Sequence, residues 1–439
     1  MGPDIKADFL PDIYSICNLA KFNASMPLWV LGDPDIKADF LTDFDREEPV
    51  SMMEPTKLGL DSRERIELVD LSIDLASKSA SLKRSLPDGV CTGLAELVRT
   101  MNCYYSNLIE GHNTHPIAIE RAMNKDYSDD PKQRDLQKEA VAHIAVQQWI
   151  DEGGLVGRAT RLDSIKEVHA RFYEHLPNEF RYVEDQDSGE KIEVIPGELR
   201  KRDVKVGHHV AVSPGAVERF LRRFEEVYSG LGKTEALLSI AAAHHRLLWI
   251  HPFLDGNGRV ARLISYAQML EHLNTGGVWS IARGLARSEQ EYKSHLMACD
   301  RQREHDTDGR GNLSESALMA FTKFFLLQCL DQVSFMEQLM EPSRLRERIL
   351  TWVERQSKEE HLLPNAKTIV EAVLYRGYLP RAEIPELLGV GDRQARRTLS
   401  GLLDTGVLQA DNDRAPVRLS FPSALAAEWM PGLFPPERT

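Results

Sequence analysis

The segment from His251 to Arg262 contains side chains that can act on a nucleotide phosphate. An unperturbed imidazole titrates near neutral pH, so His251 can take a proton from an attacking hydroxyl. Asp255 supplies a hard oxygen ligand, and Mg²⁺ is usually held by one or two carboxylates together with substrate phosphates. The residue types therefore predict a general base at His251 and a magnesium ligand at Asp255.

The same segment contains a glycine turn followed by two arginines. Gly256 and Gly258 have no Cβ, so the backbone can close on phosphate oxygens. Asn257 is expected to add its side-chain amide to this nest. Arg259 and Arg262 are three residues apart and offer planar guanidinium forks to phosphate oxygens. We expect these five residues to bind the phosphates of a nucleotide.

Two helices are expected to position this loop. Residues 236–250 are apolar and rich in alanine, which predicts a buried helix that ends at the loop. Apolar residues recur at helical spacing from Val260 to Leu270, which predicts a second helix that begins near Gly258. The turn then lies at a helix N-terminus, where unpaired N–H groups and the helix dipole favour an anion. Phe253 is interpreted as the apolar anchor of the loop.

The segment resembles the signature of Fic domains, His-Pro-Phe-x-Asp/Glu-Gly-Asn-Gly-Arg-x-x-Arg, and every fixed position is present. The resemblance implies transfer of AMP from ATP to a Ser, Thr or Tyr hydroxyl of a protein, including this protein itself, with release of pyrophosphate. Relatives that act as kinases carry a lysine at the position of Gly256. Some relatives remove AMP from modified proteins at the same site, so removal is kept as the alternative direction.

Ser106, Glu110 and Gly111 resemble the inhibitory motif Ser/Thr-x-x-x-Glu-Gly/Asn of many Fic proteins. Apolar residues between 94 and 109 recur at helical spacing, and Gly111 is placed to end that helix as its C′ residue. Ser106 and Glu110 then share one helix face. The resemblance implies a salt bridge from Glu110 to Arg262, at the position that the γ-phosphate of ATP would take. The alternative is a solvated glutamate near a helix end.

Residues 204–212 alternate apolar and polar side chains on both sides of a Gly-His-His turn, which predicts a β-hairpin. The hairpin resembles the Fic flap, which aligns the target's side chain, and an exposed strand edge can hold an extended peptide by main-chain bonds. The residues assigned to this flap are Val204, Val206, Gly207, His208 and His209. Adjacent strand residues point to opposite faces, so the two histidines are not expected to share a metal ion.

Tyr292 resembles a family tyrosine that lies near the adenine. We assign it to the ATP site, with a core position as the alternative, because single aromatic residues on helices are often buried.

The composition is typical of a large enzyme. The net charge of −13 argues against a nucleic-acid carrier or a membrane-surface protein. The 5 cysteines include no Cys-x-x-Cys pair, as expected of reduced thiols. We find no signal peptide and no apolar stretch that could span a bilayer. We therefore expect a cytoplasmic protein without a membrane partner.

The predicted fold is mainly α, with a Fic helical core, a β-hairpin flap and a small winged helix-turn-helix domain. The predicted parts are a loosely structured segment 1–60, a helical region 61–150 with the inhibitory motif, a catalytic core 151–340 and a winged-helix-like domain 341–439. The first part contains Pro-Asp-Ile-Lys-Ala-Asp-Phe-Leu twice, at 3–10 and 34–41. We leave open whether this repeat is a docking segment or an artefact.

The winged-helix resemblance rests on residues 381–418, where Asp392 is expected to cap the recognition helix. This span has six arginines and six acidic residues, so the positive field that DNA binding requires is missing. Docking of protein targets is the favoured role, and a DNA-binding regulator is the alternative. The physiological target and the oligomeric state stay open, although relatives of this layout are often homodimers.

Overall fold

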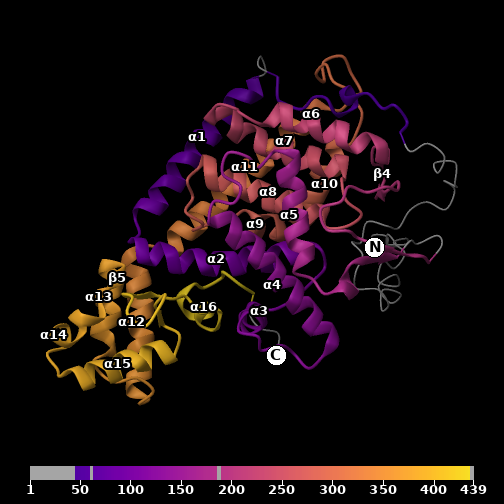
Figure 1. Cartoon of the computed structure of the whole chain (residues 1–439). Helices are drawn as coiled ribbons and strands as arrows, with labels where there is room; N and C mark the ends of the chain where they lie inside the picture. Colours follow the sequence, from indigo (N-terminus) through magenta and orange to yellow (C-terminus); the bar gives the residue numbers. More distant parts are fainter. Residues whose placement is uncertain (1–44, 60–62, 185–188, 436–439) are drawn as a thin grey trace, which may run out of the picture.

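The computed structural model describes residues 45–59, 63–184 and 189–435, which are mainly helical (Figure 1). Both copies of the N-terminal repeat lie outside these residues. Residues 45–59 differ from the expected loose segment, because Met53 and Leu58 are buried. The Tyr228 hydroxyl also donates to the Thr56 carbonyl at 2.6 Å, and Arg219 pairs with Asp45 at 2.9 Å. This stretch is therefore held against the helical core by apolar burial and by ion pairs.

The N-terminal and central parts of the described chain are built mainly from helices. These helices are α1 (Arg63–Arg84), α2 (Asp88–Ile109), α3 (Pro116–Met123), α4 (Pro131–Asp151), α5 (Leu162–Glu174), α6 (Val217–Tyr228), α7 (Lys233–Ile250), α8 (Asn257–His272), α9 (Ala282–Arg287), α10 (Glu289–Cys299) and α11 (Glu315–Leu339). Short 3₁₀ helices are η2 (Val50–Met53), η3 (Asn178–Phe180), η4 (Pro214–Ala216), η5 (Arg381–Glu383) and η6 (Ser423–Leu425).

Helix α7 lies at the centre of the bundle, where it packs against α1, α6, α8 and α11. Almost all of its side chains from Ala236 onward are buried, which agrees with its apolar, alanine-rich sequence. Helix α8 follows after a loop of six residues, and its face from Val260 to Met269 is buried as well. The two predicted helices are thus confirmed, and the core holds both ends of the loop between them.

The described residues also form three small antiparallel sheets. Strands β1 (Tyr182–Glu184) and β2 (Lys191–Glu193) form a hairpin that the sequence did not predict. The predicted hairpin is present as β3 (Lys205–Val206) and β4 (His209–Val210), in which Lys205 pairs with Val210. Gly207 takes a left-handed φ of 60° in the turn between them, which favours glycine.

The C-terminal part comprises helices and a three-stranded sheet of order β5-β7-β6. Its elements are α12 (Pro342–Lys358), α13 (Ala366–Arg376), β5 (Tyr378–Leu379), α14 (Ile384–Leu388), α15 (Asp392–Asp404), β6 (Leu408–Gln409), β7 (Val417–Leu419) and α16 (Ala426–Trp429). The expectation that Asp392 caps α15 is wrong. Asp392 is the first helical residue, and Gly391 occupies the N-cap position without a side-chain bond.

The C-terminal part packs directly against α2, the helix that leads to Glu110 (Figure 1). A Cβ on Gly93 would collide with the Leu419 carbonyl, so glycine permits a close approach of the two backbones. Arg418 pairs with Glu96 of α2 at 2.7 Å. The Tyr105 hydroxyl donates to the Leu433 carbonyl at 2.8 Å. Within the described ranges, no helix is long and apolar enough to cross a membrane.

Candidate functional site

The loop between α7 and α8 has an unusual backbone at both ends. His251 follows the last residue of α7 with φ 49° and ψ 64°, a left-handed conformation that is uncommon for a residue with a Cβ. Gly256 precedes α8 with φ 79°, where glycine is unstrained. The N-terminus of α8 therefore begins at this loop, where the first backbone N–H groups of a helix favour an anion.

Arg200 holds His251 in this conformation and connects it to the flap. Its Nε donates to the His251 carbonyl at 2.7 Å, and its Nη2 donates to the carbonyls of Val212 and Ile250. On the other side, His209 Nε2 lies 2.7 Å from the Trp249 carbonyl. The flap is therefore anchored to the end of α7. Arg200 was not predicted to be a site residue, because its partners are main-chain carbonyls, which leave no pattern in the sequence.

The half-buried His251 imidazole is neutral at physiological pH. Burial, together with the nearby charge of Arg200, lowers its pKa to about 3. A neutral imidazole has a lone pair that can accept a proton. The protonation state therefore fits a general base.

Asp255 lies at the other end of the loop and is held by two neighbours. The Tyr173 hydroxyl donates to Asp255 Oδ2 at 2.5 Å, and Arg259 Nη2 lies 2.8 Å from the same oxygen. Burial opposes its ionisation, but Arg259 and Tyr173 keep the pKa of Asp255 below its ordinary value. Tyr173, from α5, is a site residue that the sequence analysis missed.

The chemistry around Asp255 limits which cation could bind there. Its side chain is 30% exposed and ionised, so the carboxylate can act as a ligand. Among the described residues, no group of three or more His, Cys, Asp or Glu could hold a metal ion. A single ionised carboxylate such as Asp255 fits a cation like Mg²⁺, whose other ligands would be phosphates and water.

Asn257 acts differently from the prediction. Its Oδ1 accepts from the Phe253 N–H at 3.0 Å, and its Nδ2 donates to the Phe253 carbonyl at 2.8 Å. The amide thus braces the loop through both of its polar atoms. Phe253 is the predicted anchor: it is fully buried and stacks on His169 with ring centroids 3.9 Å apart.

The segment from Ser106 to Gly111, predicted to be inhibitory, lies directly against the predicted phosphate loop, residues 251–256. Glu110 follows the last residue of α2, and Gly111 takes the left-handed φ of 82° expected at C′. The Glu110 carboxylate forms an ion pair with Arg262 Nη2. Arg262 also donates to the Ser106 hydroxyl at 2.8 Å and to the Ser106 carbonyl at 3.1 Å. A Cβ on Gly258 would collide with this carboxylate, so Glu110 lies over the start of α8.

Helix α4 supplies residues that the sequence analysis did not find. Glu139 is buried and pairs with Arg259. His143 is fully buried one turn later, and burial together with Arg262 and Arg259 lowers its pKa to about 3. Glu139 and His143 lie on the buried, largely apolar face of α4, and this spacing is the signal that the sequence offers for them.

Tyr292 lies in the core on α10 and is 2% exposed. Its hydroxyl lies 2.6 Å from His244 Nε2, and its ring packs near Phe321. This environment agrees with the core alternative, and its contact with adenine stays a prediction.

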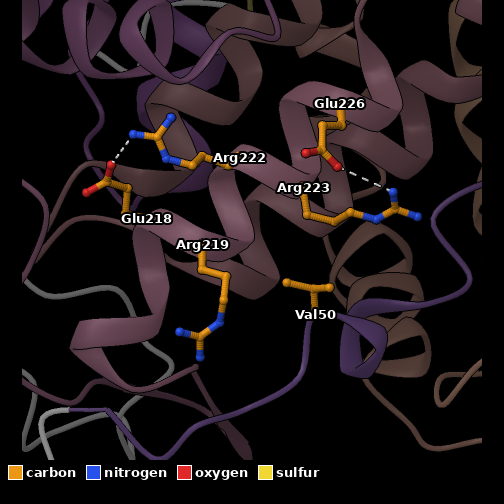
Figure 2. Close-up of a pocket in the computed structure, with 6 residues that line it drawn as sticks. All are labelled: Val50, Glu218, Arg219, Arg222, Arg223 and Glu226. Carbon is orange, nitrogen blue, oxygen red and sulfur yellow. Dashed lines mark hydrogen bonds and ion pairs between the residues drawn. The ribbon is translucent and has the colours of Figure 1, made fainter.

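A separate surface pocket of about 520 Å³ lies over α6 (Figure 2). Its lining residues are Val50, Glu218, Arg219, Arg222, Arg223 and Glu226. Each arginine is paired with an acidic side chain, as Arg222 is with Glu218 at 2.5 Å. None of the motif residues lines this pocket, so the pocket is not the candidate site.

Comparison with known proteins identifies relatives of this region. Residues 159–269 match the Fic/DOC family. The chain is 31% identical to "Protein adenylyltransferase Fic" of Drosophila grimshawi over 165 residues, which are 37% of this chain and 31% of that protein. It is 28% identical to the Drosophila erecta protein of the same name over 212 residues, 47% of this chain and 38% of that protein. The match thus spans about a third of the length of these curated relatives.

Solved structures of Fic proteins are also similar. One is a Fic family protein from Desulfovibrio desulfuricans G20, with 14% identity, a TM-score of 0.48, and coverage of 83% of this chain and 98% of that one. Another is Fic-1 from C. elegans, with 17% identity, a TM-score of 0.44, and coverage of 64% and 73%.

Proposed function

We propose that this protein transfers AMP from ATP to a hydroxyl side chain of a protein, because residues 159–269 match the Fic/DOC family. The observation that carries the proposal is the loop itself, in which a neutral His251 and the N-terminus of α8 lie on one short segment. Arg259 and Arg262 flank that helix end with largely buried guanidinium groups. The names of the similar proteins, which are adenylyltransferases, support the same reaction.

In the proposed reaction, the His251 imidazole takes the proton of the target hydroxyl while that oxygen attacks the α-phosphorus of ATP. A new phosphorus–oxygen bond forms to the target, the bond to the bridging oxygen breaks, and pyrophosphate leaves. The backbone N–H groups of α8 and the arginine forks hold the phosphates and stabilise their negative charge. Asp255 would hold Mg²⁺, which would neutralise phosphate charge when bound.

Glu110 is proposed to inhibit this reaction. Its carboxylate occupies the Arg262 fork, which would otherwise hold the γ-phosphate. ATP bound with a displaced γ-phosphate would have its α-phosphate out of line with the target hydroxyl, and a misplacement of about 1 Å can cost on the order of a hundredfold in rate.

Removal of AMP from modified proteins is a second candidate direction. It is favoured by the position of Glu110 over the start of α8, where a carboxylate can orient a water molecule. Glu110→Gly should then lower AMP removal while it raises AMP transfer.

For residues 341–439 we propose a winged-helix module that docks proteins. Its support is the order α13, β5, α14, α15, β6 and β7, with β7 at the centre of an antiparallel sheet. The balance of acidic and basic residues in 381–418 argues against duplex DNA as the partner. Salt-sensitive binding of a DNA duplex by the full chain would support the DNA alternative instead.

The test of AMP transfer is a mass measurement. The chain is incubated with ATP and Mg²⁺, alone and with a cell lysate, and the mass of one AMP group is sought on peptides together with released pyrophosphate. We expect both products, and we expect neither from His251→Ala. An equal yield of both products from His251→Ala would show that His251 is not the base.

A further inference from the structure

A buried chain of charges joins the inhibitory segment to the phosphate loop. Glu139 of α4 is 4% exposed, and its two carboxylate oxygens contact two different positive side chains. Oε1 pairs with Arg259 Nη1, and Oε2 lies 2.7 Å from His112 Nδ1. Arg259 continues the chain through Nη2, which lies 2.8 Å from Asp255 Oδ2.

These contacts fix the orientation of Arg259. A buried carboxylate is strongly unfavourable unless it is paired, and both Glu139 oxygens are used. Arg259 is 7% exposed, and its guanidinium lies over the Phe172 ring at 4.8 Å from the centroid. Glu139 therefore holds one terminal nitrogen of the fork, while the other points to the loop at Asp255. This second nitrogen is the one that can turn to a phosphate oxygen.

His112 connects the Glu139 carboxylate to the inhibitory segment. It lies two residues after Glu110 and directly after Gly111, where α2 has ended. The charged groups that face its ring are Glu139, Arg259 and Glu110. Burial disfavours the charged ring, but the bond to Glu139 raises the pKa of His112 above its ordinary value. The His112–Glu139 ion pair is therefore present at lower pH and is lost as the pH rises through that raised pKa.

We propose that Glu139 is a positioning residue for AMP transfer, which rests on the function proposed above. Glu139 aims the Arg259 fork at the nucleotide phosphates. By binding His112 as well, it ties the inhibitory segment to the phosphate loop through a second contact, separate from the pair between Glu110 and Arg262.

The positioning role is tested in a Glu110→Gly background, in which the first contact is absent. Adding Glu139→Gln should raise both the Kd for ATP, measured by calorimetry, and the KM for ATP by about tenfold, which corresponds to ~1.4 kcal/mol. The kcat should change less. The matched control is Asp151→Asn, which neutralises another partly buried carboxylate that pairs with an arginine, Arg99. It should leave both constants unchanged.

A merely structural role would give a different result. If Glu139→Gln lowers the melting temperature and the active fraction but leaves the Kd and KM for ATP unchanged, the positioning role is refuted. The ATP titration needs no turnover. If Glu110→Gly transfers no AMP at all, the proposed function fails, while the calorimetric comparison still decides whether Glu139 positions Arg259.

The second contact is tested with His112→Gln in the chain that keeps Glu110. AMP transfer should rise by about threefold, the effect of one modest hydrogen bond, and should not rise further in the Glu110→Gly background. Activity of the chain with His112 should increase with pH as the ion pair is lost, and His112→Gln should remove that increase. His115→Gln, three residues further on, is the control that should keep it. Identical pH profiles for His112→Gln and the unmodified chain would overturn the second contact.

Discussion

Glu110→Gly should raise AMP transfer strongly, because it removes the carboxylate that occupies the Arg262 fork. The substitution changes little else. Glu110 has φ −83° and ψ 2°, which glycine adopts readily, and the left-handed turn at Gly111 is retained. Arg262 keeps its two contacts with Ser106 and therefore stays in place.

The size of the expected rate increase follows from the burial of the ion pair between Glu110 and Arg262. The Arg262 side chain is 5% exposed and that of Glu110 is 19% exposed, so the ion pair is largely shielded from water. Displacing a carboxylate from a buried ion pair costs about 3 kcal/mol or more. Since each 1.36 kcal/mol is a factor of ten in rate, we expect roughly a hundredfold increase.

The assay is a time course of label from ATP on the protein, with matched variants. Glu110→Gln keeps the side-chain length without the charge and should give an intermediate rate. Glu152→Gly is the local control, because Glu152 also follows a helix and precedes a left-handed glycine, Gly153, but its carboxylate accepts a hydrogen bond from the Gln148 amide. It should behave as the unmodified chain does. Equal rates for Glu110→Gly and the unmodified chain would refute the inhibitory role and leave the helix end purely structural.

Three further outcomes are expected. Asp255→Asn should lower AMP transfer by roughly a hundredfold or more, as removal of one charge-stabilising group does, with the fold retained by circular dichroism; an unchanged rate and an unchanged Mg²⁺ dependence would rule out a ligand role. Gly93→Val should push α2 away from the Leu419 carbonyl, lower the free energy of unfolding by about 1–3 kcal/mol and raise basal AMP transfer; a lower melting temperature with unchanged activity would show that the contact is only structural. The free energy of unfolding should fall as the pH drops below 6.5, because His143, His169, His244 and His251 have pKa values of about 3 in the folded chain. Their stabilising contribution is complete above the pKa of about 6.5 that histidine has in the unfolded chain. It is lost toward pH 3, at up to ~1.4 kcal/mol per pH unit for each histidine. Equal midpoints of urea unfolding at pH 7 and pH 5 would contradict this expectation.

The parts of the site that are local in sequence could be predicted. The helices on both sides of the loop, the end of α2 at Gly111 and the hairpin at Gly207 follow from periodicity and from glycine, and the structure confirms them. The pair between Glu110 and Arg262 was implied by the family resemblance and is present.

The parts that depend on distant contacts could not be predicted. Glu139 reaches Arg259 across 120 residues, and Tyr173 reaches Asp255 across 82, so neither contact leaves a local pattern. Asn257 was assigned to the phosphates by its residue type, but its amide satisfies the backbone of Phe253. The packing of residues 45–59 was missed because ion pairs such as that of Asp45 with Arg219 replace an apolar periodicity.

His251 is proposed to act as the base in the transfer of AMP from ATP. Two differently labelled forms of ATP test this role most directly. Glu110→Gly is incubated with Mg²⁺ and with ATP labelled either at the α-phosphate or at the γ-phosphate. We predict that the α label appears on protein, that the γ label appears only in pyrophosphate, and that Glu110→Gly combined with His251→Ala gives neither. Transfer of the γ label to protein, or undiminished α labelling by the double variant, would contradict the account.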